Sequence, residues 1–103
     1  MIIARWQIDA RFGHKEDVLR SVKRWREDIG TRIGFSMDKT RIMTGSVGAN
    51  ESVVITEIEL PSMTELDKSW EKLSTLEEHK KWGKELEPHI VSGSHRWEIF
   101  RKA

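Results

Sequence analysis

Hydrophobic and polar residues alternate along the first segment of the chain. In residues 2–10, Ala4 and Trp6 share one face, whereas Arg5 and Gln7 share the other. This alternation is typical of a β-strand, because successive side chains of a strand point to opposite faces of the sheet. Three later segments are also rich in alternating or β-branched apolar residues and are predicted to be strands: 35–44, 51–60 and 90–101.

Between the first two strands, the apolar spacing changes to that of an amphipathic helix over residues 14–33. The apolar stripe consists of Val18, Val22, Trp25 and Ile29. Glu16 and Asp17 lie in the first turn, where the helix dipole favours negative charge. Gly34 is the expected stop, because glycine readily takes the left-handed conformation that often ends a helix.

A second helical region follows the third strand and has two start signals. Ser62 and Glu65 have the spacing of a capping box, in which the serine accepts a hydrogen bond from the start of a helix. Ser74 and Glu77 repeat this spacing and predict a second, shorter helix. Pro88 is expected to close that helix, because proline cannot continue one.

The predicted order is β-α-β-β-α-β, with the second α split in two, in a single domain over residues 1–103. This is the ferredoxin-like α+β pattern: a four-stranded antiparallel sheet with helices on one face. The strand at 51–60 has apolar residues on both faces, with Val53 and Ile55 on one and Val54 and Ile58 on the other. A large apolar patch is rare on a soluble monomer. We therefore expect a homodimer whose sheets pack face to face.

Composition excludes several classes of function. The 103 residues include five Trp but no Cys and no Tyr, and the net charge is +1. Disulfides, thiolate metal sites and cysteine or tyrosine catalysis are therefore excluded, and the charge balance argues against a nucleic-acid partner. No signal-peptide pattern occurs, and no apolar run approaches the roughly 20 residues of a membrane span. We expect a cytoplasmic protein with no membrane partner.

No nucleotide-binding or metal-binding motif is present, so no cofactor and no metal are predicted. No two histidines have the helical i, i+4 spacing of a metal site. His14, at the start of a helix, is expected to be exposed to solvent, and His89, after Pro88, to be structural.

Seven residues remain as candidates for a site. His79 is the candidate catalytic residue, as an acid–base group or ligand on a short helix. The candidate ligand-binding residues are the polar strand residues and the aromatic or imidazole side chains of the second half: Arg5, Gln7, Glu57, Trp82, His95 and Trp97. Tryptophans stack well on planar molecules, but they also serve in ordinary core packing. The polar residues could instead be the rim of an interface.

The chain resembles the dimeric α+β barrel superfamily, which includes the NIPSNAP-like and antibiotic-biosynthesis-monooxygenase-like (ABM-like) proteins. The most similar segments are Glu51–Glu59, Ser62–Leu66, Trp70–Leu73, Glu78–Trp82 and Ser94–Ile99. The resemblance implies a homodimer with its pocket between sheet and helices or inside the barrel. Activities in the superfamily include cofactor-independent oxygenation of aromatic molecules, rearrangements and haem degradation, and this diversity means that the fold alone does not fix the function.

Three functions are left open at this stage. The first is binding of a small hydrophobic or aromatic molecule, by a cofactor-independent monooxygenase or isomerase. The second is a non-enzymatic, NIPSNAP-like association or scaffold domain. The third is haem binding or degradation, since the order of Trp70 and His79 is similar to that in the haem-degrading branch. That branch also uses an Asn on the first strand, whereas this chain has Trp6 and Gln7 there.

Overall fold

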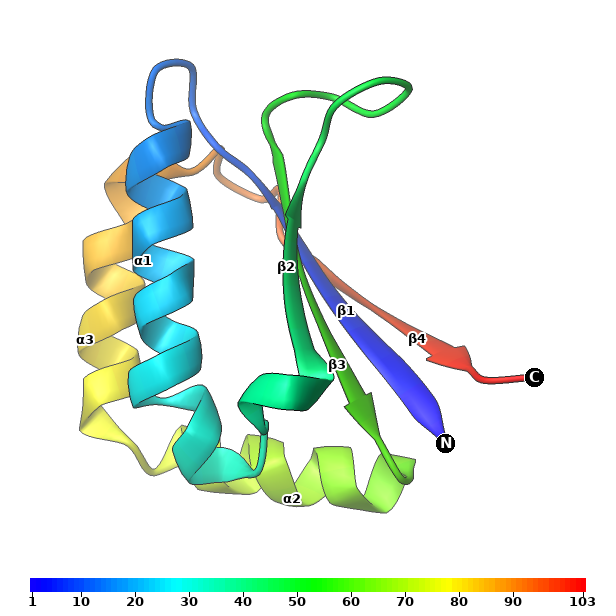
Figure 1. Cartoon of the computed structure of the whole chain (residues 1–103). Helices are drawn as coiled ribbons and strands as arrows, with labels where there is room; N and C mark the ends of the chain where they lie inside the picture. Colours follow the sequence, from blue (N-terminus) through cyan, green and yellow to red (C-terminus); the bar gives the residue numbers. More distant parts are fainter.

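The computed structural model describes all residues, 1–103, and confirms the ferredoxin-like α+β fold. The strands and helices are β1 (Ile2–Asp9), α1 (Lys15–Asp28), β2 (Thr40–Thr44), β3 (Val53–Leu60), α2 (Met63–Ser74), α3 (Glu77–Leu86) and β4 (Arg96–Arg101). The strands form one antiparallel sheet in the order β2-β3-β1-β4. All three helices lie on one side of this sheet (Figure 1).

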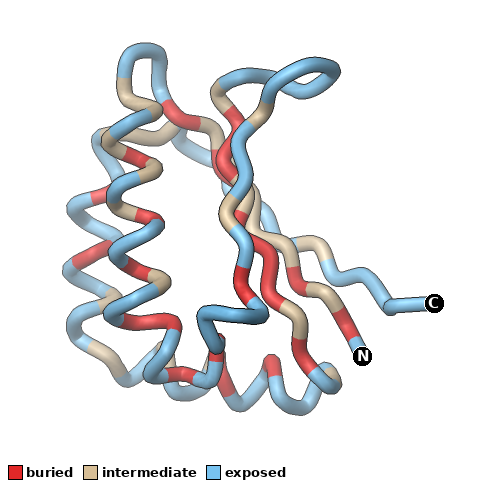
Figure 2. Tube along the Cα trace, in the orientation of Figure 1, coloured by how far each residue is buried: buried red, intermediate tan, exposed pale blue.

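The hydrophobic core lies between the sheet and the helices (Figure 2). Its fully buried members include Ala4, Ile8, Val18, Val22, Val54, Ile58 and Leu66. The strand residues among them alternate with more exposed neighbours, and the helical ones follow the predicted stripe. The faces assigned from the pattern are therefore confirmed for β1, for α1 and for the buried side of β3.

The predicted first helix is shorter than expected. Regular α-helix ends at Asp28, and a 3₁₀ turn (Gly30–Ile33) continues the chain to Gly34. Gly34 has a φ of 97° and is the left-handed stop that the sequence predicted. The apolar stripe continues through both kinds of helix, and for this reason the change between them could not be predicted from spacing.

Only one of the two predicted capping boxes exists. The Ser62 hydroxyl accepts a hydrogen bond from the backbone N–H of Glu65 at 3.4 Å, as expected. The prediction for Ser74 is wrong, because its hydroxyl donates to the Glu71 carbonyl at 2.7 Å, inside the last turn of α2. Leu76 precedes the first residue of α3 instead and provides no side-chain cap.

Two strands begin later than their sequences suggested. β2 begins at Thr40, because a 3₁₀ turn (Met37–Lys39) intervenes after the buried Phe35. β4 begins at Arg96, although Ile90 makes an isolated bridge to Ala10. The expected ranges 35–44 and 90–101 therefore each contain a turn in their first half.

The face of the sheet opposite the helices is open in the single chain (Figure 1). Ile3, Arg5 and Gln7 of β1 and Ile55 and Glu57 of β3 lie on this face, in cross-strand register. The surface that the sequence suggested as a dimer face is thus present and uncovered. None of the helices has the length and apolar character needed to cross a membrane.

Candidate functional site

An apolar cavity of about 360 Å³ lies between the sheet and the three helices. Fifteen residues line it, of which eleven are hydrophobic. All five tryptophans of the chain are among them: Trp6, Trp25, Trp70, Trp82 and Trp97. Small-molecule sites are typically cavities of about 300–1,000 Å³ with apolar walls and a few polar groups.

The five indole rings form a continuous row. The centroid of Trp82 lies 6.0 Å from that of Trp25 and 6.1 Å from that of Trp6. Trp97 extends the row at 6.5 Å from Trp6, and Trp70 completes it at 5.5 Å from Trp97. These distances are in the range of favourable aromatic contacts. We call these five residues the indole row.

Strand register and helical spacing explain the indole row. Trp6 and Trp97 are direct cross-strand partners, and Trp6 lies on the same face of β1 as the buried Ile8. Trp25 belongs to the apolar stripe of α1. Trp82 lies on α3, and its indole N–H fixes it against α1 by donating to the Ser21 carbonyl at 2.9 Å.

His79 lies in the cavity wall and is half-buried. The indole N–H of Trp25 donates to its Nδ1 at 3.0 Å, and its ring stacks on Trp82 with a centroid distance of 5.8 Å. An indole nitrogen can only donate, so Nδ1 of His79 must be the unprotonated acceptor. The neutral ring therefore carries its proton on Nε2.

Burial holds the pKa of His79 below its ordinary value, because desolvation disfavours the charged imidazolium. The hydrogen bond from Trp25 acts in the same direction, since it needs a free lone pair on Nδ1. His79 is therefore neutral around pH 7, with Nε2–H as the group left for a ligand. This arrangement suits a hydrogen-bond donor to a ligand oxygen, because transfer of the Nε2 proton from the neutral ring would leave an imidazolate anion.

Thr56 supplies a second polar group, which sequence reasoning missed. It lies on the helix-facing side of β3, paired with Trp6, and lines the cavity. Its hydroxyl oxygen is buried and has no hydrogen-bond partner. Leaving a buried hydroxyl unpaired costs about 1–3 kcal/mol. The signal in the sequence was a threonine on the inward face of β3, which is otherwise apolar.

The predicted site residues separate into two groups on opposite sides of the sheet. His79, Trp82, His95 and Trp97 line the cavity. The other three, Arg5, Gln7 and Glu57, lie on the uncovered face. The sheet separates these groups, so they cannot contribute to one pocket within a single chain.

On the uncovered face, Glu57 forms an ion-pair network with two arginines. Its carboxylate oxygens accept from Arg5 at 2.8 Å and from Arg41 at 2.7 Å. Burial alone would raise the pKa of Glu57, but the hydrogen bonds and charges of both arginines outweigh it and hold this pKa below its ordinary value. Arg5 also lies over the ring of Phe100, with 5.3 Å to the centroid. Polar and apolar groups are thus mixed on this face.

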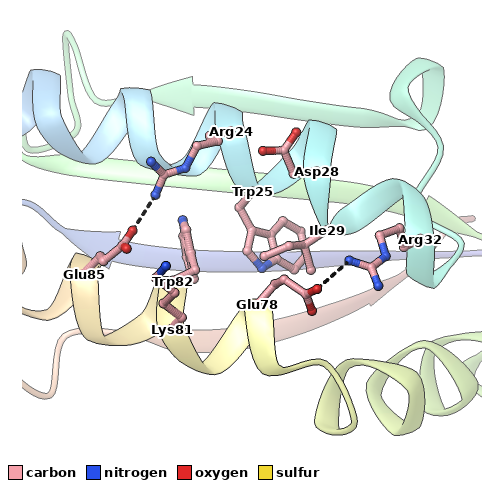
Figure 3. Close-up of a pocket in the computed structure, with 9 residues that line it drawn as sticks. All are labelled: Arg24, Trp25, Asp28, Ile29, Arg32, Glu78, Lys81, Trp82 and Glu85. Carbon is pink, nitrogen blue, oxygen red and sulfur yellow. Dashed lines mark hydrogen bonds and ion pairs between the residues drawn. The ribbon is translucent and has the colours of Figure 1, made fainter.

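A second hollow, of about 330 Å³, lies on the outer side of α1 and α3 (Figure 3). Ion pairs cross it at both ends, from Arg24 to Glu85 at 2.8 Å and from Arg32 to Glu78 at 3.5 Å. Trp25 and Trp82 line both this hollow and the inner cavity. The two rings therefore separate a charged outer groove from the apolar cavity, and the cavity is the better candidate site.

Comparison with known proteins identifies the fold. No family model matches the chain, and no curated protein matches its sequence. A NIPSNAP family protein from Agrobacterium tumefaciens has a similar structure, with a TM-score of 0.80, 17% identity and coverage of 99% of this chain and 92% of that one. An uncharacterized NIPSNAP domain protein from Burkholderia xenovorans gives a TM-score of 0.71 at 12% identity, over 100% and 95% of the two chains.

The other group named by the sequence resemblance is also found. A putative antibiotic biosynthesis monooxygenase from Nitrosomonas europaea has a TM-score of 0.71 and 9% identity, covering 99% of this chain and 98% of that one. At these identities the likeness concerns the fold, because one fold supports many activities. The chain therefore has the ferredoxin-like α+β fold of NIPSNAP and antibiotic biosynthesis monooxygenase proteins, the two groups that its sequence resembles.

Proposed function

We propose that this protein binds a small, largely apolar and planar molecule in the cavity lined by the indole row. The observation that carries this proposal is the convergence of all five tryptophans on one cavity of about 360 Å³. Stacking on indole rings favours flat aromatic or quinoid ligands. The cavity size fits a molecule of two or three fused rings.

Two polar groups would orient such a ligand. The Nε2–H of His79 can donate to a ligand oxygen, and the hydroxyl of Thr56 has no partner within the protein. A few convergent polar groups in an apolar cavity are typical of sites that select a ligand and fix its orientation. A phenol, enol or quinone therefore fits better than a pure hydrocarbon.

The first reaction to test is oxygenation or isomerisation of the bound molecule. The Nitrosomonas europaea protein with this fold is described as a putative antibiotic biosynthesis monooxygenase. The chain has no Cys or Tyr, so the reaction would depend on the ligand's own reactivity and on the Nε2–H of His79, which can stabilise negative charge on a ligand oxygen by a hydrogen bond. Ligand binding without turnover would favour the alternative of a non-enzymatic domain.

Calorimetric titration with 2-naphthol, 1,4-naphthoquinone and naphthalene tests the binding site. The discriminating variant is Gly83→Leu: Gly83 lines the cavity on α3, and a Cβ built there meets no atom within 4 Å. The leucine would fill part of the cavity without a backbone clash, so we expect at least a tenfold loss of naphthol affinity. Lys84→Leu adds the same side chain at an exposed position and should leave affinity unchanged.

Thr56→Val tests orientation separately from volume. The substitution keeps the side-chain shape and removes the hydroxyl, so the preference for naphthol over naphthalene should shrink. The binding proposal is refuted if no probe binds, or if Gly83→Leu and wild type bind naphthol equally.

Titration with hemin tests the third function, haem binding. Nδ1 of His79 accepts a hydrogen bond from Trp25, so haem iron would have to bind Nε2.

We further propose that two copies pair through the uncovered sheet face. Ile55, Met43 and Phe100 lie there with no helix above them, beside the network of Glu57. Light scattering after size exclusion should report a dimer for the wild type and a monomer for Ile55→Lys. Thr31→Lys, an exposed change on the helical side, should stay dimeric. A monomeric wild type would overturn this proposal without affecting the cavity.

A further inference from the structure

Two histidines and an aspartate that are far apart in the sequence meet at one end of the molecule. Nδ1 of His14 lies 2.9 Å from Nδ1 of His89. An oxygen of Asp17, Oδ2, lies 4.0 Å from the first nitrogen and 3.8 Å from the second. The three side chains are partly buried, and no other His, Cys, Asp or Glu is close enough to join them. We call these residues the His–Asp–His cluster.

The backbone holds this cluster in place from both sides. His14 immediately precedes α1, and Asp17 lies one turn later on the same helix. His89 ends the 3₁₀ turn after α3 (Glu87–His89), which Pro88 stiffens. The segments are tied by the hydrogen bond from the N–H of Arg11 to the His89 carbonyl, at 2.9 Å. Figure 1 shows this turn, in orange, behind the start of α1.

We propose that the His–Asp–His cluster is a binding site for a divalent transition metal of the Zn²⁺ class. Two imidazoles and one carboxylate are ligands that Zn²⁺, Co²⁺ and Ni²⁺ accept. Three protein ligands would leave the fourth tetrahedral position to water. The cluster lies outside the indole-lined cavity, so this proposal stands independently of the proposed function.

The observed distances are close to those that a metal needs. Ligand atoms about 2.0–2.1 Å from a tetrahedral Zn²⁺ lie about 3.3 Å from one another. The two nitrogens, now at 2.9 Å, would move apart by about 0.4 Å, and the carboxylate oxygen would approach by about 0.5–0.7 Å. Small rotations of partly exposed side chains allow shifts of this size.

The present contacts keep the ligand atoms directed at one another. One of the two facing nitrogens must carry a proton for His14 and His89 to hydrogen-bond, and on metal binding that imidazole would move its proton to Nε2. Arg20 holds the other oxygen of Asp17, Oδ1, at 3.2 Å and leaves Oδ2 directed at the histidines. The cluster is therefore largely preorganised.

Calorimetry of the untagged chain with ZnCl₂ tests this site. We expect one Zn²⁺ per chain. The dissociation constant should be at least tenfold larger for His14→Gln and for His89→Gln. Asp17→Asn, which keeps the shape but removes the charge, should also weaken binding. His95→Gln is the matched control, since His95 lies outside the cluster, and it should bind Zn²⁺ like the wild type.

Two further measurements do not depend on the variants' folding. Saturating Zn²⁺ should raise the melting temperature of the wild type by about 5 °C or more, because the ligand binds the folded form alone. In histidine ¹⁵N spectra of the wild type, Zn²⁺ should shift the Nδ1 signals of His14 and His89 and leave those of His79 in place. The proposal is overturned if the wild type takes up no Zn²⁺, if the glutamine variants bind it equally well, or if other histidines shift instead.

Discussion

Replacing Trp25 by Phe removes the hydrogen bond that fixes His79 and opens space beside it. Trp25 is 9% exposed, and its ring packs against Phe35 and Trp82. Loss of the hydrogen bond to His79 should cost about 1 kcal/mol. Phe also lacks the five-membered ring of the indole, and loss of this ring from a buried position adds about 1–2 kcal/mol. We therefore expect the free energy of unfolding to fall by about 2–3 kcal/mol in total.

The substitution should also change the titration of His79. The Trp25 N–H stabilises only the neutral ring, and the lost volume admits water that can solvate the imidazolium. The pKa of His79 should therefore rise from its lowered position towards the ordinary value. Urea unfolding gives the stability, and NMR titration of the ring protons of His79 gives the pKa.

Trp70→Phe is the matched control, because Trp70 lies at the other end of the indole row and packs against Trp97. Its indole N–H donates no hydrogen bond within the protein, unlike those of Trp25 and Trp82. It removes the same ring volume from a half-buried position, so it should cost less stability and leave the pKa of His79 unchanged. The reasoning fails if Trp25→Phe changes the stability by less than about 0.5 kcal/mol, or if the pKa of His79 stays or falls.

Three further predictions concern other polar groups. The pKa of His79 is lowered in the folded state, so the unfolded state takes up a proton first as the pH falls. The free energy of unfolding should therefore be highest above about pH 6.5 and should decrease at lower pH. His79→Gln should remove this part of the pH dependence in urea titrations. Ser69→Ala should cost about 1–2 kcal/mol in thermal or urea unfolding, because the buried hydroxyl donates to the Ile33 carbonyl at 2.6 Å, whereas the exposed Ser74→Ala should be nearly neutral. Glu57→Gln should cost about 1 kcal/mol at neutral pH, and the difference from wild type should shrink as the pH falls below the ordinary carboxyl pKa of 4.5; an equal loss at every pH would contradict the ion-pair explanation.

Much of the fold could be predicted because its elements have strong local signals. The alternation around Trp6 and the stripe through Trp25 place each residue on the correct face. The start of β4 was predicted too early, because Ile90 and Val91 are typical strand residues, whereas Ser92 and Gly93 after them form a turn. In this turn the Ser94 hydroxyl donates a hydrogen bond to the Val91 carbonyl and accepts one from the backbone N–H of Asp9. The second contact depends on the neighbouring strand β1.

The candidate site was predictable in its composition but not in its arrangement. Sequence reasoning named His79 and Trp97, yet it could not tell which sheet face a pocket would use, and so it also named Glu57, on the opposite face. Similarly, His14 and His89 looked unrelated, since 75 positions separate them. Only the docking of the turn after α3 against the start of α1 brings them together.

The indole row also determines how the protein interacts with light. Every tryptophan of the chain belongs to it, so no indole elsewhere contributes a constant background to the emission. With neighbouring centroids 5.5–6.5 Å apart, excitation absorbed by one ring can migrate along the row before it is emitted. The ultraviolet fluorescence of the whole molecule therefore reports on the indole row alone, and a quencher reaching any of the five rings, from the cavity or from the outer groove, should dim them all.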